Sequence, residues 1–141
     1  MRFTKTSVLM LAAVMATAVV LSVPAVVTAH SVAMRVAIPF EFHVGNQTLP
    51  AGKYLVQKIG DSLRISDRDG HSATAITNAV SGTSMGTKTE LVFNQYGRRF
   101  FLSEARWEGY MSGRSLAKSK AEIELAKVMT AERVDLVSNV R

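Results

Sequence analysis

The stretch MRVAIPFEFHV (residues 34–44) alternates apolar and polar side chains along most of its length. Its apolar positions are Met34, Val36, Ile38, Phe40, Phe42 and Val44. A two-residue period predicts a strand with one buried face. Pro39 cannot donate a ladder hydrogen bond, so it places this strand at a sheet edge or a bulge, or divides it into two shorter strands. His43 falls on the polar side, and we expect it to face solvent.

Similar alternation and turn residues predict further short strands along the chain. Clusters of Gly, Pro, Asn and Asp, which favour turns, occur at 45–46, 49–52, 60–61 and 67–70. Gly97 is expected to close a hairpin between two apolar segments, 91–93 and 100–102. The predicted strands after the first are 53–59, 63–65, 71–80, 87–93, 100–107 and 133–140.

A single helix is predicted before the last strand. Ser119-Lys120-Ala121-Glu122 has the pattern of a capping box, which starts a helix that we expect to reach about Thr130. Ile123 does not fit the apolar stripe and would meet a loop, a membrane or a partner. The stripe expected to pack on the sheet contains Ala121, Leu125, Val128 and Met129. Together these elements predict a mainly β fold, an antiparallel β-sandwich or small β-barrel of about seven strands with one C-terminal helix before the last strand.

The N-terminus has the layout of a signal peptide. Arg2 and Lys5 precede an uncharged apolar run over residues 8–23, and Val27-Thr28-Ala29 fits a peptidase site. We expect cleavage of residues 1–29, which leaves 30–141 as a single small β-rich domain in the periplasm or outside the cell. The alternatives are a weaker cleavage site after Ala33 and retention of the segment as a membrane anchor. Since the chain has no cysteine, no disulfide stabilises it after export.

Positive charge is concentrated in one window. Residues 30–141 hold 15 Lys and Arg, because Arg2 and Lys5 leave with the signal, against 11 acids; residues 98–120 hold six against two, so the remainder balances nine against nine. This window would attract an anionic envelope component or a glycan, and no specific nucleic acid is expected. A solvated face and aromatic core packing are the alternatives. The predicted binding residues are Arg106, Trp107, Tyr110 and Arg114.

The stretch SGTSMG (81–86) places Ser84 in the G-x-S-x-G spacing of a nucleophile elbow. An elbow needs a helix after the serine, whereas the following residues predict a strand. The three histidines of residues 30–141 lie at the new terminus or in or beside predicted strands, with no sign of a triad. A serine hydrolase using Ser84 is therefore the disfavoured alternative. No spacing of ligands predicts a metal site, and no motif predicts a cofactor.

Several short patterns resemble a family of small exported bacterial proteins that have no assigned function. They cover nearly the whole of residues 30–141 and consist of Ile38-Pro39-Phe40-x-Phe42, Leu49-Pro50-Ala51-Gly52-x-Tyr54, Arg99-Phe100-Phe101-Leu102-Ser103, Trp107, Gly109 and Ser119-Lys120-x-Glu122. Because these are turn and core residues, the resemblance implies the fold and export, and it transfers no catalytic residue. We therefore expect an exported non-catalytic binding or envelope-interaction protein. The alternative is a carrier of a small apolar ligand in a barrel cavity.

Overall fold

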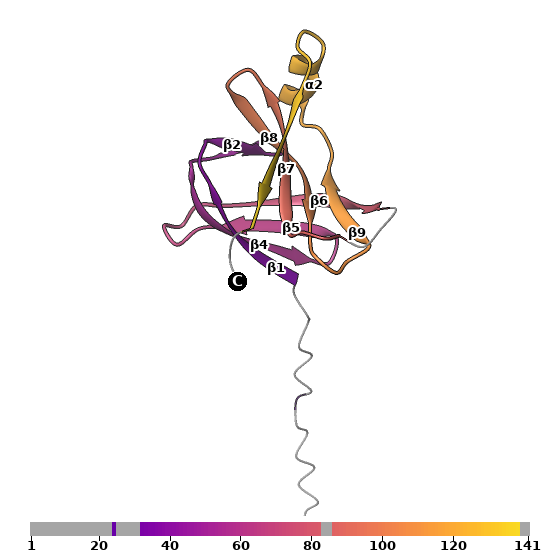
Figure 1. Ribbon diagram of the computed structural model, residues 1–141. Coiled ribbons are helices and arrows are strands. Elements are labelled where there is room, and N and C mark those ends of the chain that lie inside the picture. Colours follow the sequence, from indigo (N-terminus) through magenta and orange to yellow (C-terminus); the bar gives the residue numbers. More distant parts are fainter. Residues whose placement is uncertain (1–23, 25–31, 83–85, 139–141) are drawn as a thin grey trace, which may run out of the picture.

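The computed structural model of the chain describes residues 32–82 and 86–138, together with Pro24 (Figure 1). The predicted signal segment, Pro24 apart, and Ser84 lie outside the described residues. The described elements, in chain order, are β1 (Val32–Ile38), β2 (Phe42–Val44), β3 (Gln47–Leu49), β4 (Gly52–Ile59), β5 (Ser62–Ser66), β6 (Ser72–Ser81), β7 (Glu90–Tyr96), β8 (Arg99–Arg106), β9 (Ser112–Leu116), α2 (Lys120–Ala126) and β10 (Glu132–Val137).

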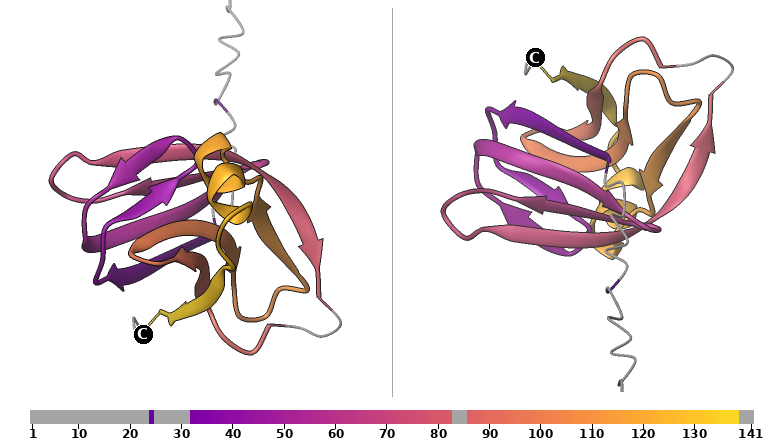
Figure 2. Two further views of the ribbon diagram at one scale, coloured as in Figure 1. Left: turned by 90° about the horizontal axis from the view of Figure 1, so that it is seen from above. Right: turned by 90° about the horizontal axis from the view of Figure 1, so that it is seen from below.

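The ten strands form one sheet that rolls up on itself. From β1 the neighbours run β4, β5, β6, β9 and β8, and β8 then leads both to β7 and β10 and to β2 and β3. The pairs are antiparallel except for β2 and β8, which pair in parallel at His43 and Phe101. At the end of β10 the Ser138 hydroxyl donates a hydrogen bond to the Arg35 carbonyl of β1 at 2.5 Å. The predicted mainly β fold, with its helix before the last strand, is confirmed as a barrel-like sheet (Figure 2).

The start of β1 and the end of β10 lie at the same end of the barrel, whereas α2 and the turn between β7 and β8 lie at the opposite end (Figure 1). Between these ends β6 changes its partner. Residues 72–76 pair with β5, and residues 77–81 pair with β9. Thr77 is the first residue after this change, so it stands where the two halves of the sheet join.

The core confirms the alternation predicted for residues 34–44. Its apolar side chains at Met34, Val36 and Ile38 are buried, and Pro39 divides the predicted strand into β1 and β2. Aromatic rings meet edge to face inside the barrel: the centroid of Phe42 lies 5.2 Å from that of Tyr54 and 5.7 Å from that of Phe93. Side chains therefore fill the interior of the barrel.

Ten strands form where about seven were predicted. The break at Pro39 accounts for one of them, and two more are short. β3 was expected as part of a turn, but it completes a hairpin with β2. β9 was expected as a loop around Gly113, but it pairs with both β6 and β8. A local hairpin thus forms β3, whereas long-range pairing forms β9 from a segment whose Gly and Ser content favours a loop.

The helix begins as predicted but packs differently. The Ser119 hydroxyl accepts a hydrogen bond from the Glu122 N–H at 3.2 Å, which confirms the cap. The Glu122 carboxylate does not return to Ser119; it accepts bonds from Asn94 Nδ2 at 2.9 Å and from the Tyr96 hydroxyl at 3.1 Å. Glu122 is consequently the buried residue of α2, which ends at Ala126 rather than near Thr130.

The apolar stripe predicted for the helix is wrong for three of its four residues. Ala121 is exposed within α2, whereas Leu125 is half-buried. Val128 and Met129 lie beyond the end of α2 and are 79% and 43% exposed. Since the helix is anchored through Glu122, its short length leaves these two side chains outside the core.

His43 does not face solvent freely, in contrast to the prediction. Its ring is half-buried and stacks on Phe101 with the centroids 4.6 Å apart, and its Nδ1 lies 2.9 Å from the Thr48 hydroxyl. Burial and the nearby Arg99 guanidinium lower the pKa of His43, while Glu41 partly opposes them. The folded chain therefore favours the neutral ring where β2 meets β8.

We expect this preference to make stability depend on pH. As the pH falls through the ordinary value of 6.5, the unfolded chain takes up a proton at His43 that the folded chain accepts only at lower pH. The wild type should therefore lose stability between about pH 7.5 and about pH 5.5, relative to a His43→Gln variant. Urea unfolding followed by circular dichroism measures this difference, because the two chains differ only at residue 43. An identical pH dependence in the two chains would contradict the role of His43.

Candidate functional site

Arg114, a predicted binding residue, is a core side chain. It is only 6% exposed and sits on β9 beside the point where β6 changes partner. Its Nε donates to the Thr77 hydroxyl at 2.9 Å, and its Nη2 donates to Asp61 Oδ1 at 2.7 Å and to the Thr77 carbonyl at 3.3 Å. Thr77 in turn donates both its N–H and its hydroxyl to the Asp61 carbonyl. We call Arg114, Thr77 and Asp61 the β6 clamp.

The other three predicted binding residues differ in their surroundings. Trp107 is 5% exposed, and its indole Nε1 has no hydrogen-bond partner among the described residues. Arg106 is half-buried and donates from Nε and Nη2 to Glu104 Oε2 at 2.9 and 2.7 Å. Tyr110 is 52% exposed. A binding surface made of all four residues is not present in this fold, because Trp107 and Arg114 belong to the core.

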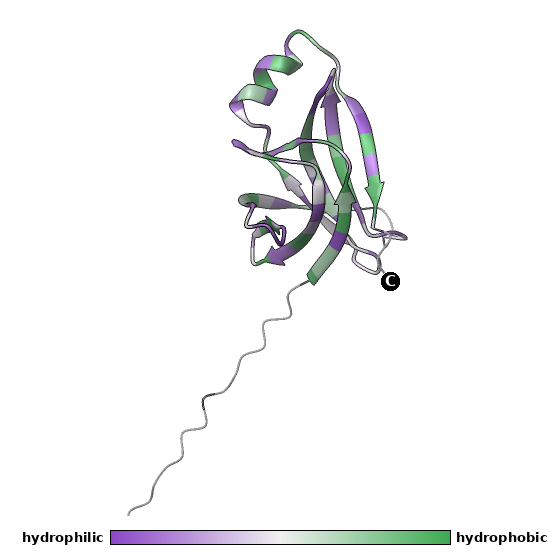
Figure 3. Ribbon diagram, turned by 90° about the vertical axis from the view of Figure 1, so that its left-hand side faces the viewer, coloured by the Kyte–Doolittle hydropathy of each residue, from purple (hydrophilic) through white to green (hydrophobic). Residues whose placement is uncertain are grey.

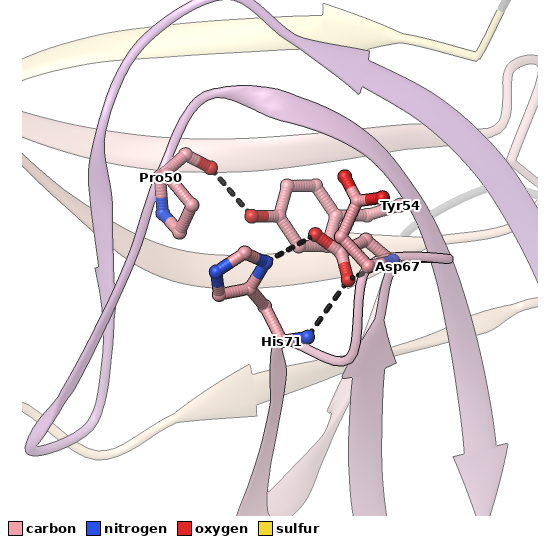
Figure 4. A network of polar contacts seen from close by, with 5 residues as sticks. Pro50, Tyr54, Asp67 and His71 are labelled. Carbon is pink, nitrogen blue, oxygen red and sulfur yellow. Dashed lines mark hydrogen bonds and ion pairs between the residues drawn. The ribbon is translucent and has the colours of Figure 1, made fainter.

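An acid and a histidine meet at the connection between β5 and β6 (Figure 4). Asp67 Oδ2 lies 2.7 Å from His71 Nδ1, while Asp67 Oδ1 accepts the N–H groups of Asp69 and His71. Although burial raises the pKa of Asp67, the hydrogen bonds from His71 outweigh it, and the net pKa is lowered. This is the turn chemistry predicted for residues 67–70.

The same pair lies far from the described residue that precedes the Ser84 segment. His71 precedes β6 and Gly82 follows it, so about 33 Å of extended strand separates His71 from Gly82. Residues 86–89 lead into β7 rather than into a helix, as predicted. The described surroundings therefore lack the strand–turn–helix context of a nucleophile elbow.

Gly86, the second glycine of the G-x-S-x-G pattern, has a packing role. Its N–H donates to the Tyr110 carbonyl at 3.1 Å, and its carbonyl accepts from the Gly109 N–H at 3.0 Å. A Cβ at this position would stand 2.8 Å from the Trp107 carbonyl oxygen. Gly86 is thus the residue that allows two backbone segments to approach closely.

Hydrophobic and hydrophilic residues are mixed along α2 at one end of the barrel (Figure 3), and exposed apolar and cationic side chains occur there together. We name this region the hairpin–helix end; it comprises the β7–β8 turn at Gly97 and Arg98, Arg99, and residues 120–129. Its apolar members are Ile123, Val128 and Met129, and its exposed cations are Arg98, Arg99, Lys120 and Lys127.

Two contacts bring the parts of the hairpin–helix end together. Glu122 joins α2 to β7 through Asn94 and Tyr96, and burial followed by the Glu122 charge raises the pKa of the Tyr96 hydroxyl, which keeps it a donor. At the tip, Met129 Cε lies 3.3 Å from the place of a Cβ on Gly97. Gly97 has φ +62°, a conformation that favours glycine in this turn.

Part of the hairpin–helix end was indicated by the sequence. Arg98, Arg99 and Lys120 belong to the basic window, and Ile123 was noted as an apolar residue outside the predicted stripe. Val128 and Met129 were missed, because their exposure depends on the long-range tether of Glu122.

Two hollows open to solvent lie outside the packed core. One, of about 790 Å³, lies between Arg35 of β1, residues 87–89 and Ser138. The other, of about 430 Å³, lies between the β2–β3 turn, Ile76 of β6 and residues 116–119. Since the core side chains fill the barrel itself, these hollows lend little support to a carrier that encloses an apolar ligand.

Other classes of site find no support within the described residues. No group of three or more His, Asp or Glu is placed to hold a metal ion there. In the same part of the chain, no helix combines the length and apolar character needed to cross a bilayer. Comparison with family models, with curated proteins and with solved structures finds no match for this chain.

We expect Arg114→Met to destabilise the fold by about 2 to 3 kcal/mol, because it leaves the buried Thr77 without its charged donor and removes the ion pair with the exposed Asp61. The matched control is Arg106→Met, which removes an equal charge from a partly exposed ion pair and should cost less than about 1 kcal/mol. Urea unfolding followed by the fluorescence of Trp107, the single tryptophan, measures both variants. Equal losses in the two variants would contradict the β6 clamp.

Gly86→Ala should cost about 1 to 3 kcal/mol, since the added methyl group would press on the Trp107 carbonyl. At Gly52 a Cβ would stand 3.6 Å from the Tyr54 ring, so Gly52→Ala should change the stability by less than about 1 kcal/mol. Thermal unfolding followed by circular dichroism compares them. A Gly86→Ala chain as stable as the wild type would show that this approach of the two segments is not required.

Proposed function

We propose that this protein is an exported, non-catalytic binding protein of the cell envelope whose hairpin–helix end docks on an anionic membrane surface. The observation that supports it is the joint exposure of Ile123, Val128 and Met129, at 46%, 79% and 43%, beside a group of exposed cations. Large apolar side chains that are exposed together beside cations are typical of surfaces that meet a membrane or a partner.

The charges of the hairpin–helix end favour an anionic bilayer. Arg98, Arg99 and Lys120 are exposed, and the Lys127 ammonium is shared with Glu124 at 2.9 Å. Near an anionic lipid surface each Lys or Arg contributes about 1 kcal/mol of attraction. The exposed apolar side chains would then enter the headgroup region, where their burial adds a contribution that salt does not screen.

Export is proposed on the N-terminal sequence and on the position of β1. Val32 and Ala33 already pair with Lys58 and Gln57 of β4. Cleavage after Ala29 would keep this pairing, whereas cleavage after Ala33 would remove two residues of β1. The first of the two predicted sites therefore fits the domain better.

Sedimentation with lipid vesicles tests the proposal on the exported chain, whose intact mass first establishes the cleavage site. The wild type should bind vesicles that contain phosphatidylglycerol and should not bind vesicles of phosphatidylcholine alone. Arg98→Glu combined with Lys120→Glu should weaken binding at least about tenfold. Arg64→Glu combined with Arg68→Glu, two exposed sites on β5 and the turn after it, gives the same net charge and should bind like the wild type.

A second pair of variants separates a membrane from a soluble polyanion. Val128→Ser combined with Met129→Ser should weaken vesicle binding while the melting temperature stays unchanged, because both side chains are exposed. If these variants bind vesicles normally, or if both charge-reversed pairs lose binding equally, the hairpin–helix end is not a membrane surface. Saturable binding to an anionic polysaccharide with no vesicle binding would identify a glycan as the partner instead.

A further inference from the structure

The last strand, β10, offers an edge along which another strand could pair. It pairs with β7 on one side, and no strand pairs with its other side among the described residues. The Ser138 hydroxyl, just beyond the strand, donates a hydrogen bond to the Arg35 carbonyl of β1. β10 therefore stands at the margin of the sheet, with hydrophilic and hydrophobic residues alternating along it (Figure 3).

The hydrogen bonds define which backbone groups point outward from this edge. The Ser138 N–H donates to the Thr89 carbonyl at 2.8 Å, and this pair continues the register of β10 with β7. In an antiparallel ladder every second residue directs both its N–H and its C=O to the partner strand. Val134 and Leu136 thus face β7, and Arg133 and Asp135 direct their backbone groups outward.

The side chains on this edge are complementary to themselves. Arg133 Nε lies 2.8 Å from Asp135 Oδ1 on the exposed face, and the two side chains are 52% and 42% exposed. If a second β10 pairs antiparallel about a two-fold axis at Val134, Arg133 of each copy lies opposite Asp135 of the other. Both backbone hydrogen bonds can form within each of these pairs, and opposite charges directly across a ladder are favourable.

We infer that β10 mediates weak antiparallel self-association of this chain, with residues 132–136 of two copies paired about Val134. The pairing ends before Ser138, because that residue is bound to β1. Two such short edges bury far less than the roughly 1,200–2,000 Å² of a stable interface, so the dimer forms only at high local concentration. The competing explanation is that Arg133 and Asp135 protect the edge from any pairing.

Charge exchange at the two positions distinguishes these explanations. Arg133→Asp alone and Asp135→Arg alone each place like charges opposite each other, and each should weaken self-association at least about tenfold. A mixture of these two variants restores complementary pairs between unlike chains, so it should associate. The doubly exchanged chain, Arg133→Asp with Asp135→Arg, should also associate like the wild type.

Sedimentation velocity of the exported chain over a range of concentrations gives the readout, without lipid, so that it does not depend on membrane docking. Trp107 fluorescence confirms that each variant is folded, which is expected because both side chains are exposed. A wild type that remains monomeric at its highest soluble concentration would overturn the inference. Equal association of the two single variants and the wild type would overturn it as well, because the register would then not depend on these charges.

Discussion

The guanidinium of Arg114 is the group on which the joining of the sheet depends. It is held where β6 stops pairing with β5 and starts pairing with β9. A charge in this position is favourable only because Thr77 and Asp61 accept its hydrogen bonds. The contacts join three stretches of chain, around Asp61, Thr77 and Arg114.

Local patterns predict much of this fold, because strands and turns leave short-range marks in a sequence. The alternation through residues 34–44, the break at Pro39 and the hairpin at Gly97 all appear where they were predicted. β9 could not be predicted from its composition, since Ser112–Leu116 is held by partners that are distant in the chain. The burial of Arg114 has the same origin, because a sequence window does not reveal Asp61, 53 positions away.

The candidate site shows a similar division between local and distant causes. Arg98, Arg99 and Lys120 of the basic window are exposed, whereas Trp107 and Arg114 are core residues of the same window. Glu122 illustrates the reason. Its spacing from Ser119 suggests a capping box, but two side chains of β7 offer its carboxylate better partners. These two hydrogen bonds orient α2 so that its apolar residues stay outside the core.

The two ends of the barrel carry different parts of the chain. β1 starts and β10 finishes at one end, and the hairpin–helix end lies at the other (Figure 1). If the N-terminal segment were kept as an anchor, its own membrane would lie behind the domain, and the cationic tip would point to whatever surface stands opposite. Removal of that segment frees the same tip to turn toward either side.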